Sequence, residues 1–404
     1  MSTAPLPRQA GVAQGLVMAV TSFLPIMAII SLVPAVPSLI QHFSATPNAQ
    51  TLIPLMLTAP GLMIAILSPF VGWVVDRIGR RTLLLWATLL YGICGTMPLY
   101  IHELSSIFIT RLGVGVSEAV VLTVANTMMM DYFGVNRRRF WLMIQGLVGP
   151  LFASGIIAIS GFLTAVQWNG AFWIYAVSFP LFIAMYIWMY EPEVIGRHAD
   201  EPDIDDRNFP WKRILTVVSV TFCVAILYYI YTINGASAFH SLQGAPVERV
   251  GLILSIVSLV VPIGSLLFGY LSKRISPEHV LGVMMILIGV GMGGVGIATN
   301  EVRMGIAGAV QQLGSGMAVS AMIFWVSSLF GPAHRGRAMG AWCSAFFAGM
   351  FVSPLFFSAL RNMAGNDVLY PFRIAGPLAI FVGVLFLGFA VSSFARALRF
   401  AKAQ

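Results

Sequence analysis

The stretch that decides the fold reads Gly72-Trp73-Val74-Val75-Asp76-Arg77-Ile78-Gly79-Arg80-Arg81. It places one acid, three arginines and two glycines within ten residues, and a long apolar run lies on each side of it. Across the whole chain 58% of the residues are hydrophobic and only 9% are charged. Charges are costly inside the hydrocarbon of a membrane. The stretch is therefore predicted to be a loop between two membrane-spanning helices.

The composition as a whole indicates a membrane protein that crosses the bilayer many times. A hydrophobic fraction of 58% exceeds the roughly 45–50% of soluble domains. Apolar runs of about 20 residues, the length that a spanning helix needs, follow one another along almost the entire chain. We predict an all-α membrane protein of about twelve transmembrane helices, the first of them a single span over residues 14–39.

The net charge of +8 follows from membrane topology. If the N-terminus is cytoplasmic, 18 of the 23 basic residues fall in cytoplasmic segments. Only Arg249, Arg303 and Arg361 fall in outer loops, and Arg111 and Arg373 lie inside or at the edge of spans. The positive-inside rule then places both termini in the cytoplasm, in a bacterial-type inner membrane. The charge therefore gives no reason to expect a nucleic-acid partner.

The longest hydrophilic stretch, 191–213, carries seven acids and four bases. Such a composition stays solvated, and it divides the chain into a six-helix bundle over 1–190, a cytoplasmic linker over 191–212 and a second six-helix bundle over 213–404. Gly72…Arg77 is echoed by Gly269…Arg274, at an offset of 197. Phe133-Gly134…Arg138 is echoed by Phe330-Gly331…Arg335 at the same offset. Two loops that share one offset predict duplicated bundles.

The first loop resembles that between the second and third helices of major facilitator superfamily transporters, whose pattern G-x-x-x-D-R-x-G-R-R it matches at every fixed position. The resemblance implies two pseudo-symmetric six-helix bundles that alternately open a central cavity to each side of the membrane. It also implies a gating motif, in which Asp76 contacts the eleventh helix near Arg337. The alternative is that the arginines only anchor the topology. The motif residues are Gly72, Asp76, Arg77, Gly79, Arg80 and Arg81.

The fourth span contains two charged residues, Arg111 and Glu118. Each charge at bilayer depth costs about 2.5–3.5 kcal/mol on insertion scales, so such residues are candidates for function. They are seven residues apart and share a helix face, about 10 Å apart along the axis. Glu118 is the only acid well inside a predicted span, and we assign it to proton coupling; the alternative is a static partner of Arg111 or of a nearby hydroxyl. Arg111, which resembles the fourth-helix arginine of drug:proton antiporters, is assigned to substrate binding, with snorkelling to the outer interface as its alternative.

Two further segments resemble the drug:proton branch of the same superfamily. The run from Gln145 to Gly155 is similar to its antiporter motif, with Ala153 and Ser154 in place of paired glycines. Gly149 and Pro150 within that run predict a helix bend, because proline removes a backbone hydrogen bond. The first span has Pro34-Ala-Val-Pro37 but no acid, which leaves the proton site to Glu118.

Polar and aromatic groups in other spans would suit a cavity for an amphipathic organic compound. Tyrosines near a helix end can instead belong to the interfacial belt. The candidate substrate-binding residues are Arg111, Asn126, Gln145, Tyr228, Asn234 and Gln311.

We therefore expect a proton-coupled secondary transporter that exports a small organic compound by substrate:proton antiport. The alternative is proton-coupled uptake of an organic anion, with Arg111 binding its carboxylate. A membrane enzyme or sensor is a third possibility, but the sequence has no metal-ligand cluster, nucleophile motif or phosphate loop, so we expect neither an enzyme nor a cofactor. The expected partners are the organic substrate, protons and the lipid bilayer, with the protein acting as a monomer.

Overall fold

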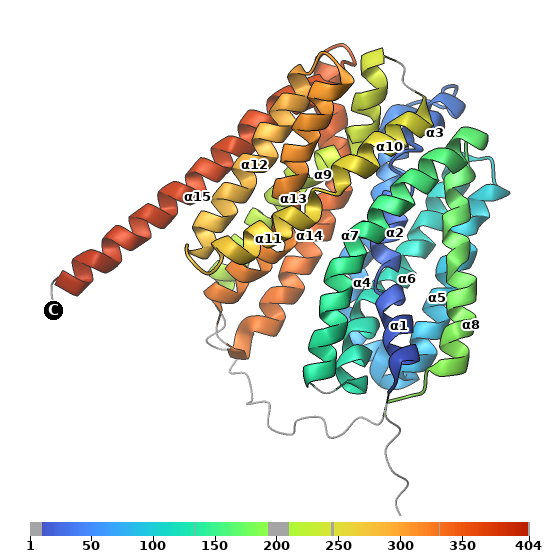
Figure 1. The fold of residues 1–404 in the computed structure, drawn as a ribbon, viewed down its shortest axis with the longest axis horizontal. Helices are drawn as coiled ribbons and strands as arrows, with labels where there is room; N and C mark the ends of the chain where they lie inside the picture. The colour runs from blue at the N-terminus through green and yellow to red at the C-terminus, as the bar shows by residue number, and fades with distance from the viewer. Residues whose placement is uncertain (1–9, 134, 193–209, 244–245, 331, 403–404) are drawn as a thin grey trace, which may run out of the picture.

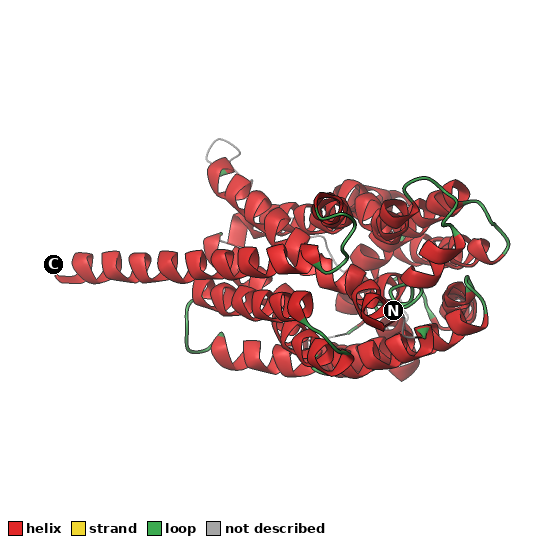
Figure 2. Cartoon of the chain, turned by 90° about the horizontal axis from the view of Figure 1, so that it is seen from above, coloured by secondary structure: helices red, strands yellow, loops and turns green. Residues whose placement is uncertain are grey.

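The computed structural model describes residues 10–133, 135–192, 210–243, 246–330 and 332–402. All regular structure in these ranges is helical (Figure 2). The elements of the first part are α1 Val12–Thr21, α2 Leu24–Ile30, α3 Val36–His42, α4 Ala49–Ile78, α5 Arg80–Thr96, η1 Met97–Leu99, α6 Leu104–Tyr132, α7 Val135–Val166, η2 Gly170–Val177 and α8 Ser178–Trp188. Those of the second part are α9 Trp211–Gln243, α10 Val247–Ser258, α11 Val261–Leu271, α12 Pro277–Ile297, α13 Glu301–Leu329, α14 Pro332–Met363 and α15 Tyr370–Lys402.

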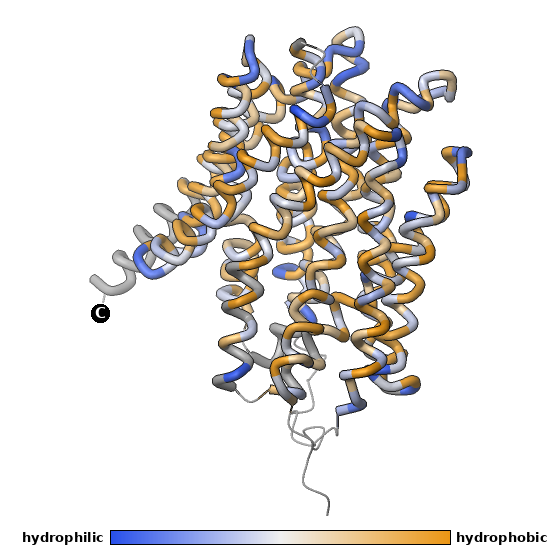
Figure 3. Tube along the Cα trace, turned by 45° about the vertical axis from the view of Figure 1, so that its right-hand side comes forward, coloured by the Kyte–Doolittle hydropathy of each residue, from blue (hydrophilic) through white to orange (hydrophobic). Residues whose placement is uncertain are grey.

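The helices have the length and composition of membrane spans. Within the described ranges, eleven segments are long and apolar enough to cross a bilayer. Helix α7 is 32 residues long, and its apolar part, Leu151–Val166, is shorter than those eleven. Figure 3 shows hydrophobic residues along most of each helix and hydrophilic ones mainly near the helix ends. The predicted all-α membrane fold is confirmed.

The first span is not the single helix that we expected over 14–39. It is divided into α1, α2 and α3, with irregular turns between them. Pro25 and Pro37 each lie at the first turn of a new helix, and Pro34 lies between the second and third. A proline has no backbone N–H to continue a helix and is best tolerated in its first turn. The prolines therefore break this span.

The repeat that appears in the loops also appears in the helices. Helices α6 and α13 are both 29 residues long and begin at 104 and 301. Helices α7 and α14 are both 32 residues long and begin at 135 and 332. Helices α5 and α12 begin at 80 and 277. All three pairs are separated by 197 residues, which is the offset of the two loop motifs.

Two hydrophobic cores accompany these repeats. One lies within α1–α8 and includes Met18, Tyr91 and Tyr175. The other lies mainly within α9–α15 and includes Met284 and Phe372. The expected linker falls largely in residues 193–209, outside the described ranges, so its boundaries stay a prediction.

The two sets of helices meet along two seams, α4 with α14 and α7 with α10. The hydroxyls of Thr51 and Ser358 bond across the first seam. Across the second, Ser154 Oγ donates to the Ser255 carbonyl at 2.8 Å and Ser255 Oγ donates to the Ser154 carbonyl at 2.9 Å. We call the end of the bundle that carries Gly79 the motif end, and the end where α4 begins the opposite end. In Figure 1 the two sets lie closest near the opposite end and diverge towards the motif end.

Candidate functional site

Glu118 lies in the middle of α6 and is completely buried. Neither of its carboxylate oxygens has a hydrogen-bond partner among the described residues. Arg111 of the same helix, Tyr91 and Tyr175 of the first core, and Tyr229 of α9 lie within electrostatic range of it. The carboxyl group therefore lies in the first set of helices, within electrostatic range of a tyrosine of the second. A buried carboxyl without partners is costly to keep ionised, which is the property expected of a group that exchanges a proton.

Arg111, about two turns after the start of α6, is also completely buried. Its Nη1 donates to Tyr175 Oη at 2.7 Å and its Nη2 donates to the Cys94 carbonyl at 3.3 Å. Its guanidinium carbon lies 4.6 Å from the ring centroid of Tyr175 and 5.3 Å from that of Phe172. The side chain thus neither snorkels to an interface nor lines a described cavity. The structure places it as a bridge between α6, α5 and η2, and its assignment to substrate binding stays a prediction.

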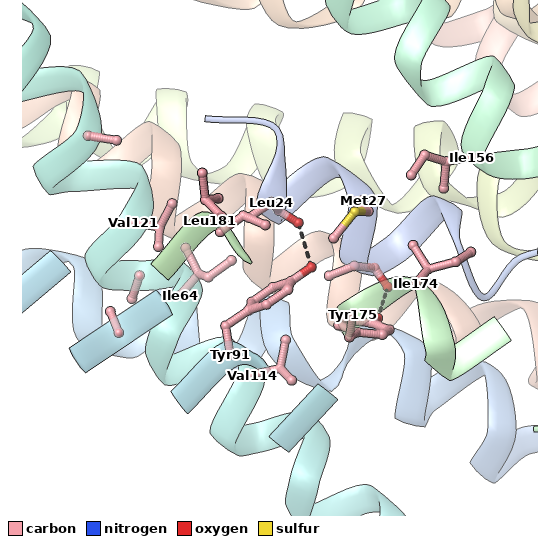
Figure 4. Packing of buried hydrophobic residues seen from close by; sticks show 14 of the residues in the cluster. Leu24, Met27, Ile64, Tyr91, Val114, Val121, Ile156, Ile174, Tyr175 and Leu181 are labelled. Carbon is pink, nitrogen blue, oxygen red and sulfur yellow. Dashed lines mark hydrogen bonds between the residues drawn. The ribbon is translucent and has the colours of Figure 1, made fainter. Parts of the chain in front are cut away.

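Two tyrosines connect this bridge to the first span. Tyr175 Oη donates to the Ala28 carbonyl at 2.6 Å, and Tyr91 Oη donates to the Leu24 carbonyl at 2.9 Å (Figure 4). Their rings lie 5.3 Å apart. The carbonyls belong to the proline-broken first span, where some backbone acceptors have no helical partner. Arg111 and the two tyrosines therefore fix α2 against the fourth span.

The equivalent region of the second set contains no charge. Gln311 is completely buried, donates to Ser315 Oγ at 2.9 Å and has no described partner for Oε1. A Cβ on Gly291 would lie 2.3 Å from the Gln311 backbone nitrogen, so Gln311 lies where α13 crosses α12. Gly308 contacts Tyr231, whose buried hydroxyl has no described partner.

The two candidate substrate-binding residues on α9, Tyr228 and Asn234, lie in different surroundings. Tyr228 is half-buried in an aromatic cluster, 4.8 Å from Tyr229 and 5.8 Å from Phe346 between ring centroids. Trp342 stacks on Phe346 at 5.5 Å. Asn234 instead lines a cavity at the opposite end and donates to the Ile230 carbonyl at 3.1 Å. Of the described candidates on α9, Asn234 therefore lines a cavity and Tyr228 lies in the aromatic cluster, and their assignment to substrate binding stays a prediction.

The motif loop makes an unexpected contact with the end of α8. Glu191 Oε1 accepts from the Arg80 backbone N–H at 2.6 Å and its Oε2 accepts from that of Arg81 at 2.8 Å. These are orphan donors at the start of α5, where a carboxylate is favoured. Gly79 has φ +91, and a Cβ there would lie 3.2 Å from Glu191 Oε1. Glycine is thus required both by the backbone conformation and by the carboxylate beside it.

Arg81 strengthens the same contact. Its Nε donates to the Met189 carbonyl at 2.8 Å and its Nη2 donates to the Tyr186 carbonyl at 2.9 Å. Part of the motif therefore joins neighbouring helices of the first set, a role that our gating interpretation did not include. Arg77 is exposed. The side chain of Asp76 and the environment of Gly72 lie outside the described part, so the contact with the eleventh helix stays a prediction.

Three other predicted residues, Asn126, Gln145 and Pro150, also have side chains outside the described part. Helix α7 continues through Gly149 and Pro150 without a break. A Cβ on Gly149 would lie 3.0 Å from the Phe23 ring, so the glycine allows close packing on the first span. The predicted bend is not tested by these observations. Among the described residues no group of three His, Cys, Asp or Glu is placed to hold a metal.

Sequence reasoning missed Glu191, Tyr175 and the serine pair of the α7–α10 seam. Glu191 was assigned to the linker by its acidic neighbours, although it directly follows the apolar run of the sixth span. Ser154 was noted only as a departure from a glycine pair. Tyr91 and Tyr175 were not distinguishable from the other aromatic residues, because their partners are backbone carbonyls of another span.

Comparison with known proteins agrees with this architecture. The family model of the Major Facilitator Superfamily matches residues 18–247 and 217–402. The chain is 23% identical over 358 residues to the tetracycline resistance protein, class E, of Escherichia coli, covering 84% of this chain and 86% of that protein. It is 22% identical over 350 residues to the "Probable sulfoacetate transporter SauU" of Cupriavidus necator, covering 76% of this chain and 77% of that protein. The crystal structure of the nucleoside transporter NupG superposes with a TM-score of 0.75 at 14% identity, over 93% of this chain and 98% of that one. The chain is a multi-pass membrane protein that belongs to the major facilitator superfamily of transporters, and it is not an enzyme.

Proposed function

We propose that the protein is a proton-coupled secondary transporter that exports a small organic compound by substrate:proton antiport. The observation that carries this proposal is the buried carboxyl of Glu118, which has no hydrogen-bond partner among the described residues and lies in α6, within electrostatic range of Tyr229 of the other set of helices. A group in this position can exchange a proton when the two sets move apart. The similarity to a tetracycline resistance protein supports export.

In this proposal both termini lie on the cytoplasmic side of an inner membrane, and the motif end faces the cytoplasm. The hydrogen bonds of the two seams then close the outer side, which corresponds to an inward-facing state. Glu118 takes up a proton when the cavity opens outwards and releases it when the cavity opens inwards, and substrate binding competes with protonation. The protein acts as a monomer, as each chain contains both sets of helices.

Arg111 and Tyr175 act as positioning residues, because they fix the fourth span against the first. The gating motif, with Asp76 near the eleventh helix, stabilises the state that is closed towards the cytoplasm. Tyr228 and its aromatic neighbours form one wall of the path for the substrate.

The second candidate is proton-coupled uptake of an organic anion. It is favoured by Arg361, which lines the same cavity as Asn234 at the opposite end, and by the similarity to a probable sulfoacetate transporter. In this case the same carboxyl of Glu118 carries the proton inwards together with the anion.

Everted membrane vesicles with an acidic lumen and a pH-reporting dye test the proposal. A panel of cationic, neutral and anionic compounds is added to vesicles with the wild type, with Glu118→Gln and with Glu103→Gln, an exposed acid at the start of the same helix. We expect a compound that alkalinises the lumen in the wild type and in Glu103→Gln but not in Glu118→Gln. A response that survives in Glu118→Gln would remove the proton-site assignment, and a lack of response to every compound would favour uptake.

A further inference from the structure

A cavity of about 380 Å³ opens at the opposite end of the bundle, between the two sets of helices. Its walls come from α3 and α4 on one side and from α9, α14 and the turn after α14 on the other. Its volume lies in the range of sites for small organic ligands. It lies at the end of the bundle where the Thr51–Ser358 hydroxyl pair joins α4 to α14. We call it the opposite-end cavity.

The charged group of this cavity is Arg361, in the last turn of α14. The sequence alone assigned it to an outer loop, but only 6% of its surface is exposed. Its Nε is buried and has no hydrogen-bond partner, and no ion pair reaches its guanidinium among the described residues. A buried charge without a partner is costly. The site therefore has one positive charge that a bound anion would neutralise.

Arg373, close by in sequence at the start of α15, shows the contrast. Its Nη1 pairs with Asp367 at 3.1 Å and its Nε donates to the Gly296 carbonyl at 2.7 Å. This arginine is half-exposed and already has a carboxylate partner. The protein thus supplies a carboxylate partner for Arg373. Among the described residues it supplies none for Arg361, which is the difference that bears on ligand binding.

The rest of the lining suits an anion with an apolar body. None of the thirteen lining residues is acidic. His240 and the side-chain amides of Gln41, Gln50 and Asn366 bring further groups able to donate hydrogen bonds. Pro37, Ile40, Phe357 and Val368 supply apolar walls. A guanidinium beside neutral donors is the arrangement that binds a carboxylate in a planar, two-bond geometry.

We propose that the opposite-end cavity is a binding site for a small organic carboxylate, whose charge is recognised by Arg361 and whose apolar part lies against the α3 and α14 walls. The proposal depends on the cavity alone and not on the direction of transport or on Glu118. If the motif end is cytoplasmic, the site faces the outside of the cell and holds the anion before entry or after release.

Three probes of nearly equal shape test the charge requirement. Benzoate, benzamide and benzamidine are titrated into the purified full chain in detergent, and binding is measured by calorimetry and by the thermal unfolding temperature. We expect saturable binding of benzoate that exceeds the binding of benzamide by about tenfold or more, and no saturable binding of benzamidine. Equal binding of benzoate and benzamide, or no saturable benzoate binding to the folded wild type, would overturn the proposal.

Four variants assign the binding to this cavity. Arg361→Gln is expected to weaken benzoate binding by about tenfold or more, and Arg361→Lys by less, because a lysine keeps the charge but not the paired geometry. Arg373→Gln is the matched control and should bind benzoate as the wild type does. Gln50→Glu places a negative charge on an exposed lining position with Arg361 intact, and it should also weaken binding, so the test does not depend on the folding of the Arg361 variants. Wild-type affinity in folded Arg361→Gln, or in Gln50→Glu, would contradict the assignment.

Discussion

Helices α6 and α13 are equivalent in the repeat, equal in length and packed in the same order within their sets, yet their interiors differ. Arg111 and Glu118 of α6 correspond to Gly308 and Ser315 of α13. Around α6, the Tyr175 hydroxyl and the Cys94 carbonyl accept hydrogen bonds from a guanidinium. Around α13, a neutral pair, Gln311 and Ser315, satisfies part of its own hydrogen bonding. The second copy of the fold is built without these charges, so the repeat as such does not require them. In the first copy Arg111 has become part of the packing, and Glu118, which has no described hydrogen-bond partner, is the charge for which we propose a function.

The largest effect is expected from removing the guanidinium of α6. Arg111→Gln loses two hydrogen bonds from a charged donor and two ring contacts, and we expect a loss of roughly 2–4 kcal/mol of stability. The check is the thermal unfolding temperature of the purified protein. Arg303→Gln, an exposed arginine at the start of α13, is the control and should change little. An equal response of the two variants would show that Arg111 is not the structural bridge described above.

An intermediate effect is expected from adding a side chain at Gly308, the position of α13 that corresponds to Arg111. A Cβ on Gly308 would lie 2.2 Å from Tyr231 Oη, so Gly308→Ala must displace a buried ring, at a cost of about 1–3 kcal/mol. Gly305→Ala, one turn earlier, has nothing within 4 Å of the new methyl group. The difference in unfolding temperature between these two variants measures how closely α13 packs against Tyr231 of α9. Equal temperatures would mean that α9 and α13 do not pack as tightly as described.

The smallest effect on stability is expected from the N-cap residues of α6 and α13, which are Glu103 and Asn300. Hydrogen bonds from Ser105 and Ser106 lower the pKa of Glu103 before α6, whereas before α13 the neutral Asn300 accepts from the Arg303 backbone N–H at 2.9 Å. A lowered pKa means that the stabilisation by Glu103 is present above the carboxyl's unfolded pKa and is lost as the pH falls through its folded pKa. The small destabilisation by Glu103→Ala should therefore shrink between about pH 7 and about pH 3, while that of Asn300→Ala should not. Unfolding temperatures at the two pH values provide the check, and a pH-independent effect of Glu103→Ala would contradict the assignment.

The fold could be predicted from the sequence because its determinants are local. The apolar runs, the charged loop of residues 72–81 and the common offset of 197 each depend on residues close together in the chain, and helices form from such local patterns. The break in the first span was missed, because its prolines were interpreted as a family feature and not as helix breakers.

The candidate site could be predicted only in part. Glu118 and Arg111 were identified as charges inside a span, since burial of charge can be inferred from the apolar neighbours in sequence. The surroundings of these two residues could not be predicted from the sequence. The partners of Arg111 come from α5 and η2, and Tyr175 bonds a carbonyl of the first span. The place of Arg361 was also missed, since the sequence does not show whether a charge near a helix end points to solvent or into a cavity.

The central claim is that Glu118 couples proton movement to transport, and the most direct test separates coupling from transport. The wild type and Glu118→Gln are reconstituted into liposomes with a compound that the vesicle panel identifies. Exchange of labelled for unlabelled compound is measured without a pH gradient, and uphill accumulation is measured with one. The account predicts that Glu118→Gln keeps exchange and loses accumulation. Accumulation that persists in folded Glu118→Gln would contradict it.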